Sequence, residues 1–117
     1  MNQVKEAKQL LNEADTILIG AAAGLSTAAG LDYVGQRFQQ YFSDYIEKYG
    51  MTDMYSVGFY PFQTLEEKWA YWSRHVLLNH YGESLPLYQD LYNLVKEKEY
   101  FVMMTNVDGQ FEKAGFD

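Results

Sequence analysis

The sequence predicts an α/β fold in which a small parallel sheet carries several helices. Two short apolar runs, residues 16–20 and 99–104, are rich in strand-forming residues, and helical periodicity fills the chain of about 80 residues between them. Strands separated by a large helical excursion are typically parallel neighbours. The 117 residues, of which 48% are apolar, suffice for a single domain with a core over residues 1–117.

The first predicted elements are a helix and a strand. Residues 2–14 are predicted as an amphipathic helix, because the apolar residues recur at helical spacing: Val4, Ala7, Leu11 and Ala14. The run 16–20 follows, bounded by Asp15 and a glycine. We interpret it as a buried parallel strand that is apolar on both faces.

A helical excursion is expected at about residues 35–81. Its first helix, 35–49, has an aromatic side made of Phe38, Tyr41, Phe42, Tyr45 and Tyr49. Residues 51–61 contain glycine and proline and are predicted as a loop. Thr64 and Glu67 form a capping-box pattern that begins a second long helix. Its apolar stripe is predicted as Leu65, Trp69, Trp72 and Val76. These helices form a small lobe on the sheet.

The chain then returns to the sheet. Gly82 ends the preceding helix, and a further helix is predicted over residues 84–98 with Leu87, Leu91 and Leu94 on its apolar side. The second strand, 99–104, follows directly, and a short helix is expected after Asn106.

Charge and composition exclude several classes of function. The net charge of −7 argues against nucleic acid or an anionic membrane as a partner. The chain has no cysteine and only two histidines, His75 and His80, so a zinc site is not expected. No run approaches the roughly 20 apolar residues of a membrane span. The sequence therefore predicts a cytoplasmic protein without a membrane partner.

A run of small residues, 20–30, follows the first strand. Glycine and alanine let the backbone turn sharply and approach a ligand closely, and free amide groups at the start of a helix favour phosphate. The run matches neither the usual dinucleotide glycine pattern nor a Walker A loop. The alternative is that small residues merely let a helix pack close to a strand.

Polar side chains follow the second strand, where Asn106 and Asp108 lie in the segment 105–110. If the strands are parallel, both loops leave the same carboxyl edge of the sheet, where open α/β sheets bind ligands. The alternative is an Asn/Asp turn in which Asp108 caps the next helix, and both interpretations can hold together.

The two loops resemble the signature motifs of the sirtuin family. Ala22-Ala23-Gly24-Leu25-Ser26 and the following Ala28-Ala29-Gly30-Leu31 are similar to G-A-G-[IL]-S-x-x-x-G-[IL]. Met104 to Gly109 is similar to T-Q-N-[IV]-D-G, and Asn106 to Asp117 most resembles the macrodomain-linked, or class M, sirtuins. The resemblance implies a partial Rossmann-like sheet that forms the N-terminal part of an NAD-binding domain.

The resemblance also implies NAD as the cofactor and a set of site residues. The NAD-binding positions are Ala22, Ala23, Gly24, Ser26, Thr105, Asn106, Asp108 and Gln110. Asn106 is expected beside the nicotinamide ribose, where it positions a water, and Asp108 is expected to bond the nicotinamide carboxamide. These two are the catalytic candidates. In deacylating sirtuins the acyl oxygen of the substrate attacks the ribose C1′ of NAD and nicotinamide leaves, whereas class M sirtuins are associated with transfer of ADP-ribose to a protein. This choice stays open.

Several positions depart from the family pattern. Ala22 replaces a glycine, and its methyl group could crowd the pyrophosphate. The usual P-D-F-R is absent from residues 31–34; Arg37 is either a substitute for its arginine or an exposed helix charge. His75 and His80 do not match the family's general base, so we interpret both as helix residues beside aromatic side chains. The tryptophans and tyrosines are expected in the core.

Sirtuins place the general base and further strands in a later segment. We therefore expect this chain alone to be catalytically incomplete. It is either a piece of an NAD-consuming enzyme or a non-catalytic remnant that binds a nucleotide or another protein. A sheet of two strands leaves both edges and one apolar surface open. This predicts a homo-oligomer or a complementing chain, and strictly monomeric sedimentation at micromolar concentration would contradict self-association.

Overall fold

The computed structural model describes residues 2–117, and within this range it contains seven helices and two strands. In chain order they are α1 (Asn2–Glu13), β1 (Thr16–Ala21), α2 (Ala23–Ala28), α3 (Gly35–Tyr49), α4 (Met54–Val57), α5 (Leu65–Asn79), α6 (Pro86–Val95), β2 (Glu99–Met104) and α7 (Gln110–Ala114). The predicted α/β class is confirmed.

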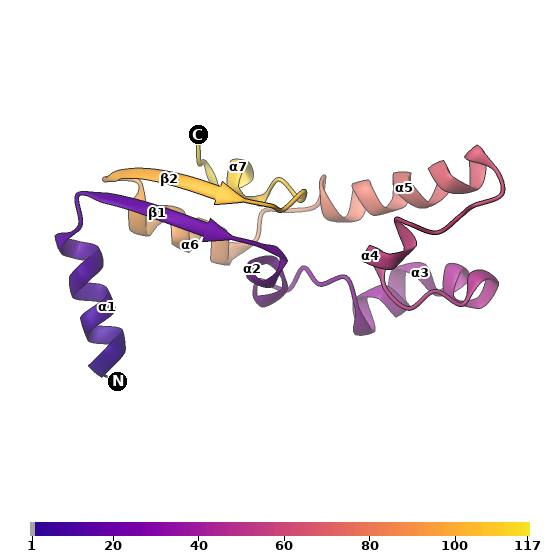
Figure 1. Cartoon of the computed structure of the whole chain (residues 1–117), viewed down its shortest axis with the longest axis horizontal. Helices are drawn as coiled ribbons and strands as arrows, with labels where there is room; N and C mark the ends of the chain where they lie inside the picture. The colour runs from indigo at the N-terminus through magenta and orange to yellow at the C-terminus, as the bar shows by residue number, and fades with distance from the viewer. Residues whose placement is uncertain (1) are drawn as a thin grey trace.

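The sheet consists of β1 and β2, which pair in parallel (Figure 1). Thr16 lies opposite Glu99, and Ala21 lies opposite Met104, so the two strands end in register. The loops that follow them therefore leave the same edge, and Thr105 N–H donates to Ala21 O at 3.3 Å just beyond the strands. The parallel pairing confirms the prediction from the helical excursion.

One face of the sheet is covered by α6 and α7. Ile17 of β1 packs in a cluster with Tyr88 and Val95 of α6 and Phe111 of α7. The cluster also receives partly buried residues from both strands: Ile19, Ala21, Tyr100, Val102 and Met104. This packing follows from the alternation of side chains along a strand, which sends every second residue to the same face.

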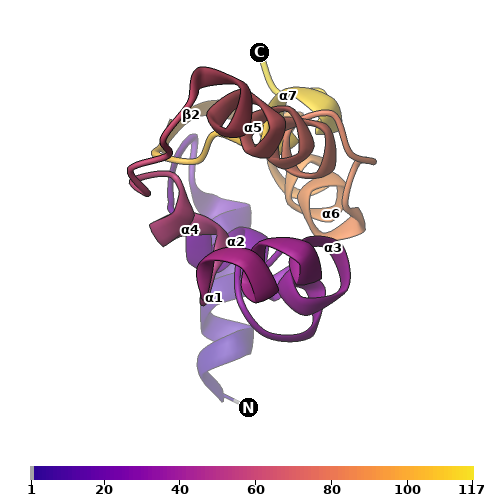
Figure 2. The same ribbon diagram turned by 90° about the vertical axis from the view of Figure 1, so that its right-hand side faces the viewer.

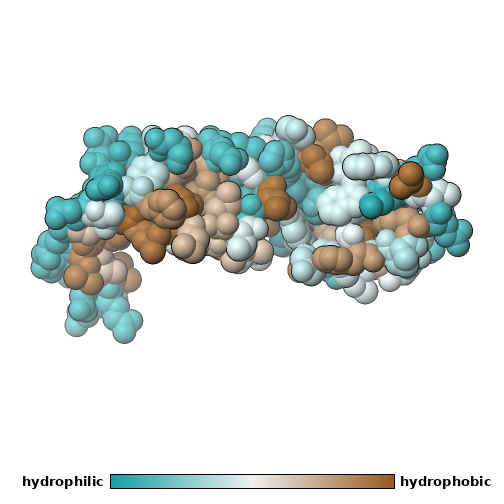
Figure 3. Space-filling view, turned by 45° about the horizontal axis from the view of Figure 1, so that its top comes forward, coloured by the Kyte–Doolittle hydropathy of each residue, from teal (hydrophilic) through white to brown (hydrophobic). Residues whose placement is uncertain are grey.

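The other face of the sheet is open. Leu18, Phe101 and Met103 point away from the helices and are 66%, 63% and 63% exposed. Apolar residues accordingly gather on the surface at the strand end of the molecule (Figure 3). The prediction that the first strand is buried on both faces was wrong for residues 2–117, because helices lie against only one side of this sheet.

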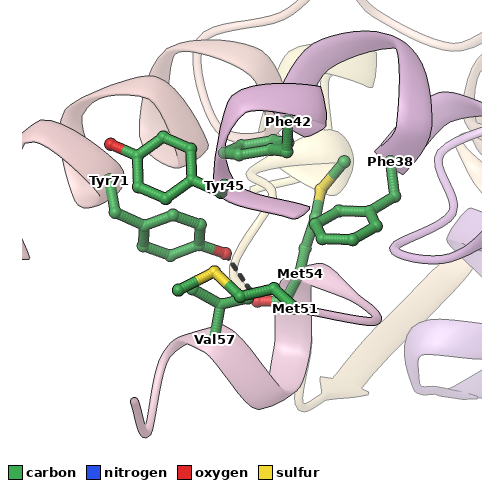
Figure 4. Packing of buried hydrophobic residues seen from close by; sticks show 7 residues of the cluster. All are labelled: Phe38, Phe42, Tyr45, Met51, Met54, Val57 and Tyr71. Carbon is green, nitrogen blue, oxygen red and sulfur yellow. Dashed lines mark hydrogen bonds between the residues drawn. The ribbon is translucent and has the colours of Figure 1, made fainter. Parts of the chain in front are cut away.

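The helices α3, α4 and α5 form a lobe, as expected, at the opposite end from α1 (Figures 1 and 2). The lobe lies beyond the carboxyl ends of the strands, however, and not on a face of the sheet. Its core joins aromatic residues of α3 and α5 with two methionines: Phe38, Phe42, Tyr45, Met51, Met54, Val57 and Tyr71 (Figure 4). The Tyr71 hydroxyl donates to Met54 O at 2.6 Å. Burial raises the pKa of this hydroxyl, which keeps it protonated as a donor.

The buried face of α5 differs from the predicted one. Leu65 and Trp69 are 69% and 65% exposed, whereas Tyr71, His75 and Asn79 are buried. These three lie four residues apart on one face, and their polar atoms bond within the lobe, so burial costs them little. The prediction from apolar residues alone was therefore wrong about which face of α5 is buried. The predicted cap was correct, since the Thr64 hydroxyl accepts from Glu67 N–H.

Smaller differences affect other helices. Tyr41 is 41% exposed, although it was placed on the aromatic side of α3. Leu94 is 64% exposed, and Tyr88 and Val95 are instead the buried residues of α6, which is also shorter than predicted. The segment predicted as a loop contains α4, because the Asp53 side chain caps it by accepting from Ser56 N–H at 2.7 Å.

The molecule is elongated. Its radius of gyration is 17.8 Å, whereas a compact domain of this size has about 13 Å. The lobe and the strand half have separate clusters of buried residues, and α1 has no buried residue at all. Within the described chain, no helix is both long and apolar enough to cross a membrane.

Candidate functional site

A cavity of about 490 Å³ lies at the carboxyl edge of the sheet. This volume falls within the range of small-molecule sites. The lining comes from the loop after β1, the start of the lobe and the loop after β2: Ala23, Ser26, Thr27, Leu31, Asp32, Tyr33, Val34, Tyr55, Thr105, Asn106, Val107 and Asp108. The prediction that both loops meet at one edge is therefore confirmed.

The first loop passes directly into α2. Ala22, in extended conformation, precedes the helix, and Ala23 and Gly24 form its first residues. All three are exposed, while Ser26 on the same short helix is 3% exposed. Of the three, only Ala23 lines the cavity, whereas Ala22 and Gly24 lie outside its lining. The helix turns Ser26 inward.

Ser26 lies at the centre of a buried hydrogen-bond network. Its hydroxyl donates to Asp108 Oδ2 at 2.5 Å and lies 2.5 Å from the Tyr88 hydroxyl. Asn106 Nδ2 donates to Ala22 O at 3.2 Å and also lies 3.3 Å from the Tyr88 hydroxyl. The two sequence motifs, separated by about 80 residues in the chain, are thus joined through side chains.

Asp108 has a structural role besides its place in the cavity wall. It is 4% exposed, and its Oδ1 accepts from Gln110 N–H at 3.1 Å at the start of α7. The alternative that Asp108 caps α7 was wrong in its detail, because the cap residue is Gly109 and makes no side-chain cap bond. Asp108 instead accepts from the first residue of the helix across a turn, and this bond holds together with its cavity position. Lys113 Nζ donates to Asp108 O at 3.2 Å and ties the loop to α7.

Gln110 does not line the cavity. It is 1% exposed, its Oε1 accepts from Leu85 N–H at 2.9 Å, and its Nε2 donates to Glu83 O at 3.0 Å. Both groups of the amide are thereby committed to the turn before α6. Gln110 supports the loop that carries Asn106 and Asp108 and does not reach a ligand in this arrangement.

The cavity is acidic. Two carboxylates, Asp32 and Asp108, belong to its lining, and no lysine or arginine does among the residues that the structure describes. Asp32 Oδ1 is buried and has no hydrogen-bond partner among residues 2–117, so the wall holds an acceptor oxygen without a donor. Burial raises the pKa of the Tyr33 hydroxyl, and Asp108 raises it further. Such a site favours cationic or hydrogen-donating groups over anions.

Comparison with known proteins identifies relatives whose names share ADP-ribosyl transfer. A protein ADP-ribosyltransferase of Staphylococcus aureus (strain Mu50 / ATCC 700699) is 38% identical over 116 residues, which cover 98% of this chain. A probable bifunctional ADP-ribose hydrolase/ADP-ribosyltransferase of Fusarium oxysporum f. sp. cubense is 35% identical over 114 residues, or 94% of this chain. This chain is similar to ADP-ribosyltransferases. No family model matches it.

The similarity extends over only part of each relative. The chain spans 37% of the length of the bacterial protein and 19% of the fungal one.

Three residues considered from the sequence lie outside the lining of the cavity. Arg37 is half-buried and donates to Asn79 Oδ1 at 2.7 Å and to Leu78 O at 3.1 Å, so it is neither an exposed charge nor part of the cavity lining. His75 is buried beside the Tyr33, Tyr71 and Trp72 rings, and burial, with Arg37, lowers its pKa. The His80 ring lies beside Tyr81, and its Nδ1 lies 2.8 Å from Val107 O.

Sequence reasoning missed several residues of the site. Among them, Asp32, Tyr33 and Tyr55 line the cavity, and Tyr88 of α6 bonds two lining residues, Ser26 and Asn106, from behind. Asp32 could have been found from its position directly after the first motif. The tyrosines carried no signal, because 11 tyrosines are spread along the chain and most were expected in the core.

Metal ligation has no support within residues 2–117, where no group of three or more histidine, aspartate or glutamate side chains is arranged to hold an ion.

Proposed function

We propose that this chain forms the part of a sirtuin-like, NAD-consuming site that binds the nicotinamide and its ribose. Three findings support the proposal. The two loops resemble the sirtuin motifs, the relatives are named for ADP-ribosyl transfer, and the loops together line one cavity. The second motif resembles that of class M sirtuins.

The acidic lining of the cavity is the observation that carries this proposal. The nicotinamide ring of NAD is cationic, and positive charge develops on the ribose when nicotinamide leaves. Carboxylates beside such a centre stabilise that charge, whereas they would repel the diphosphate. Asp32 and Asp108 therefore favour the nicotinamide ribose inside the cavity. The phosphates would lie at the mouth, against the exposed backbone of Ala22, Ala23 and Gly24.

The polar residues of the cavity have distinct proposed roles. Asn106 would lie beside the ribose and position a water, and Asp108 would bond the carboxamide while it holds Ser26. Thr105 would contribute a hydroxyl at the exposed end of the loop. Gln110, proposed from the sequence as a binding residue, would act only by fixing the loop.

The reaction proposed for a site built on these residues is ADP-ribosyl transfer to an acceptor protein. The names of both relatives specify ADP-ribosyl transfer, which favours this reaction over deacylation. The proposed role of this chain in the reaction is to bind and orient NAD. Orientation of the reactants supplies a large share of the rate acceleration in such displacements.

Calorimetric titration with ADP-ribose and NAD tests the proposal. We expect saturable binding to the wild type, and we expect Ala23→Leu to abolish it, because a leucine at this exposed, cavity-lining position would occupy the cavity. Ala28→Leu is the matched control, since Ala28 is exposed on the same helix but does not line the cavity. Absence of binding at millimolar ligand, or equal binding by the two variants, would contradict the proposed site.

We also propose that the open face of the sheet mediates self-association. Leu18, Phe101 and Met103 form an exposed apolar surface on a sheet of two strands, which is marginal without a second covering layer. We expect a dimer or larger species in sedimentation at micromolar concentration and a monomer for Phe101→Lys. Phe59→Lys, at a 76% exposed position in the lobe, is the control and should associate like the wild type. A monomeric wild type would contradict self-association.

A further inference from the structure

Tyr88 lies beneath the proposed site and belongs to neither sequence motif. It is 0% exposed, and its ring packs edge-on against Phe111 with the centroids 5.0 Å apart. Its hydroxyl lies 2.5 Å from Ser26 Oγ and accepts from Asn106 Nδ2 at 3.3 Å. One phenol of α6 thus contacts both motif loops at once.

Counting hydrogens fixes the direction of every bond in this network. Asp108, as a carboxylate, only accepts, and it receives the single hydroxyl hydrogen of Ser26 at Oδ2. Ser26 Oγ must therefore accept from Tyr88, whose one hydrogen is then used. The Tyr88 oxygen is left as an acceptor, and it receives a hydrogen from Asn106 Nδ2.

The same counting fixes the orientation of the Asn106 amide. Nδ2 faces three acceptors of the protein, namely Ala22 O, Ser26 Oγ and the Tyr88 hydroxyl. Ala22 O is a carbonyl and cannot donate, so the amide nitrogen and not the oxygen must face inward. Since Asn106 lines the cavity, its Oδ1 is the polar atom that it can offer to a ligand there.

We infer that Tyr88 is a positioning residue that locks the Asn106 amide with its oxygen toward the ligand. The inference rests on the proposed function and specifies what this position recognises. With Tyr88 in place, Asn106 presents an acceptor, which suits a ribose hydroxyl or a bound water. Without the Tyr88 hydroxyl, Nδ2 keeps Ala22 O and Ser26 Oγ as acceptors but loses the third, and Ser26 Oγ loses one of its two donors. The amide is then held less firmly, and its oxygen is presented to the ligand for a smaller fraction of the time.

The variant that tests this inference is Tyr88→Phe, which keeps the ring against Phe111 and removes only the hydroxyl. The matched control is Tyr92→Phe on the same helix, whose ring packs against Phe116 with the centroids 5.1 Å apart. The Tyr92 hydroxyl is not part of the hydrogen-bond network of Ser26, Tyr88 and Asn106 within the described residues. The first measurement is made without ligand: the ¹⁵N–¹H signals of the Asn106 side-chain amide, assigned by their loss in Asn106→Asp. We expect a changed shift and faster hydrogen exchange in Tyr88→Phe, and wild-type values in Tyr92→Phe.

The second measurement is ADP-ribose affinity by calorimetry. We expect an approximately tenfold weakening in Tyr88→Phe, the equivalent of one net hydrogen bond, and less than a twofold change in Tyr92→Phe. An unchanged Asn106 amide in Tyr88→Phe would overturn the inference whatever the ligand result, as would unchanged affinity in a protein that binds. If the wild type binds no ADP-ribose but the Asn106 amide signals still change in Tyr88→Phe, the positioning role of Tyr88 is supported. That result would count against the proposed function alone.

Discussion

Asp108→Ala is expected to abolish measurable ADP-ribose binding and to lower the free energy of unfolding by about 3 kcal/mol. The carboxylate is 4% exposed and accepts from both Ser26 and Gln110 N–H. Its removal leaves two buried donors without a partner, and each such loss costs about 1–3 kcal/mol. Urea denaturation measures the stability, and calorimetric titration measures the binding.

Two further variants separate charge from shape in this experiment. Asp108→Asn keeps the side-chain volume and an oxygen for Gln110 N–H but removes the negative charge. Binding of NAD by Asp108→Asn at wild-type affinity would contradict the idea that the acidic lining selects a cationic group. Asp90→Ala, at an exposed position of α6, is the control for net charge and should leave both stability and binding unchanged.

Phe42→Ala is expected to cost about 3–5 kcal/mol of stability, with the effect concentrated in the lobe. Phe42 is 0% exposed, and its ring lies 5.6 Å from Phe38 and 5.3 Å from Tyr71 between centroids. Truncation removes one of the side chains that link α3 to α5. Hydrogen exchange resolved by residue should show faster exchange across these two helices.

The matched control for this prediction is Phe59→Ala. Phe59 is 76% exposed, so its truncation should change the free energy of unfolding by no more than about 0.5 kcal/mol. The two clusters of buried residues share no member, which is why we expect the strand half to keep its protection in Phe42→Ala. Equal acceleration in α6 and β2 would show that both halves unfold as one unit.

The strands and their edge could be predicted because their signals are local. The runs that became β1 and β2 are short, apolar and bounded by turn residues, and the structure places their ends within one residue of the prediction. Their parallel pairing followed from the long excursion between them. The meeting of Ser26, Asn106 and Asp108 then followed, since parallel strands deliver their loops to one edge.

Burial was harder to predict, because it depends on partners distant in the sequence. His75 and Asn79 are buried on α5 since their polar atoms find bonds inside the lobe, whereas Trp69 on the same helix is exposed. Tyr88 was likewise treated as one of many aromatic core residues. Only the coordinates show that its hydroxyl lies where α2 and the loop after β2 meet.

The cavity takes its walls from both halves of an elongated molecule. Tyr33 and Tyr55 belong to the lobe side, while Asn106 and Asp108 follow the sheet. A ligand that contacts both walls binds most tightly at one angle between the halves, and by thermodynamic linkage it shifts the population toward that angle. The free energy needed to bring the two halves to that angle reduces the apparent affinity for the ligand. Substitutions at the junction, such as one at His80 that breaks its bond to Val107 O, would therefore change affinity without touching the ligand.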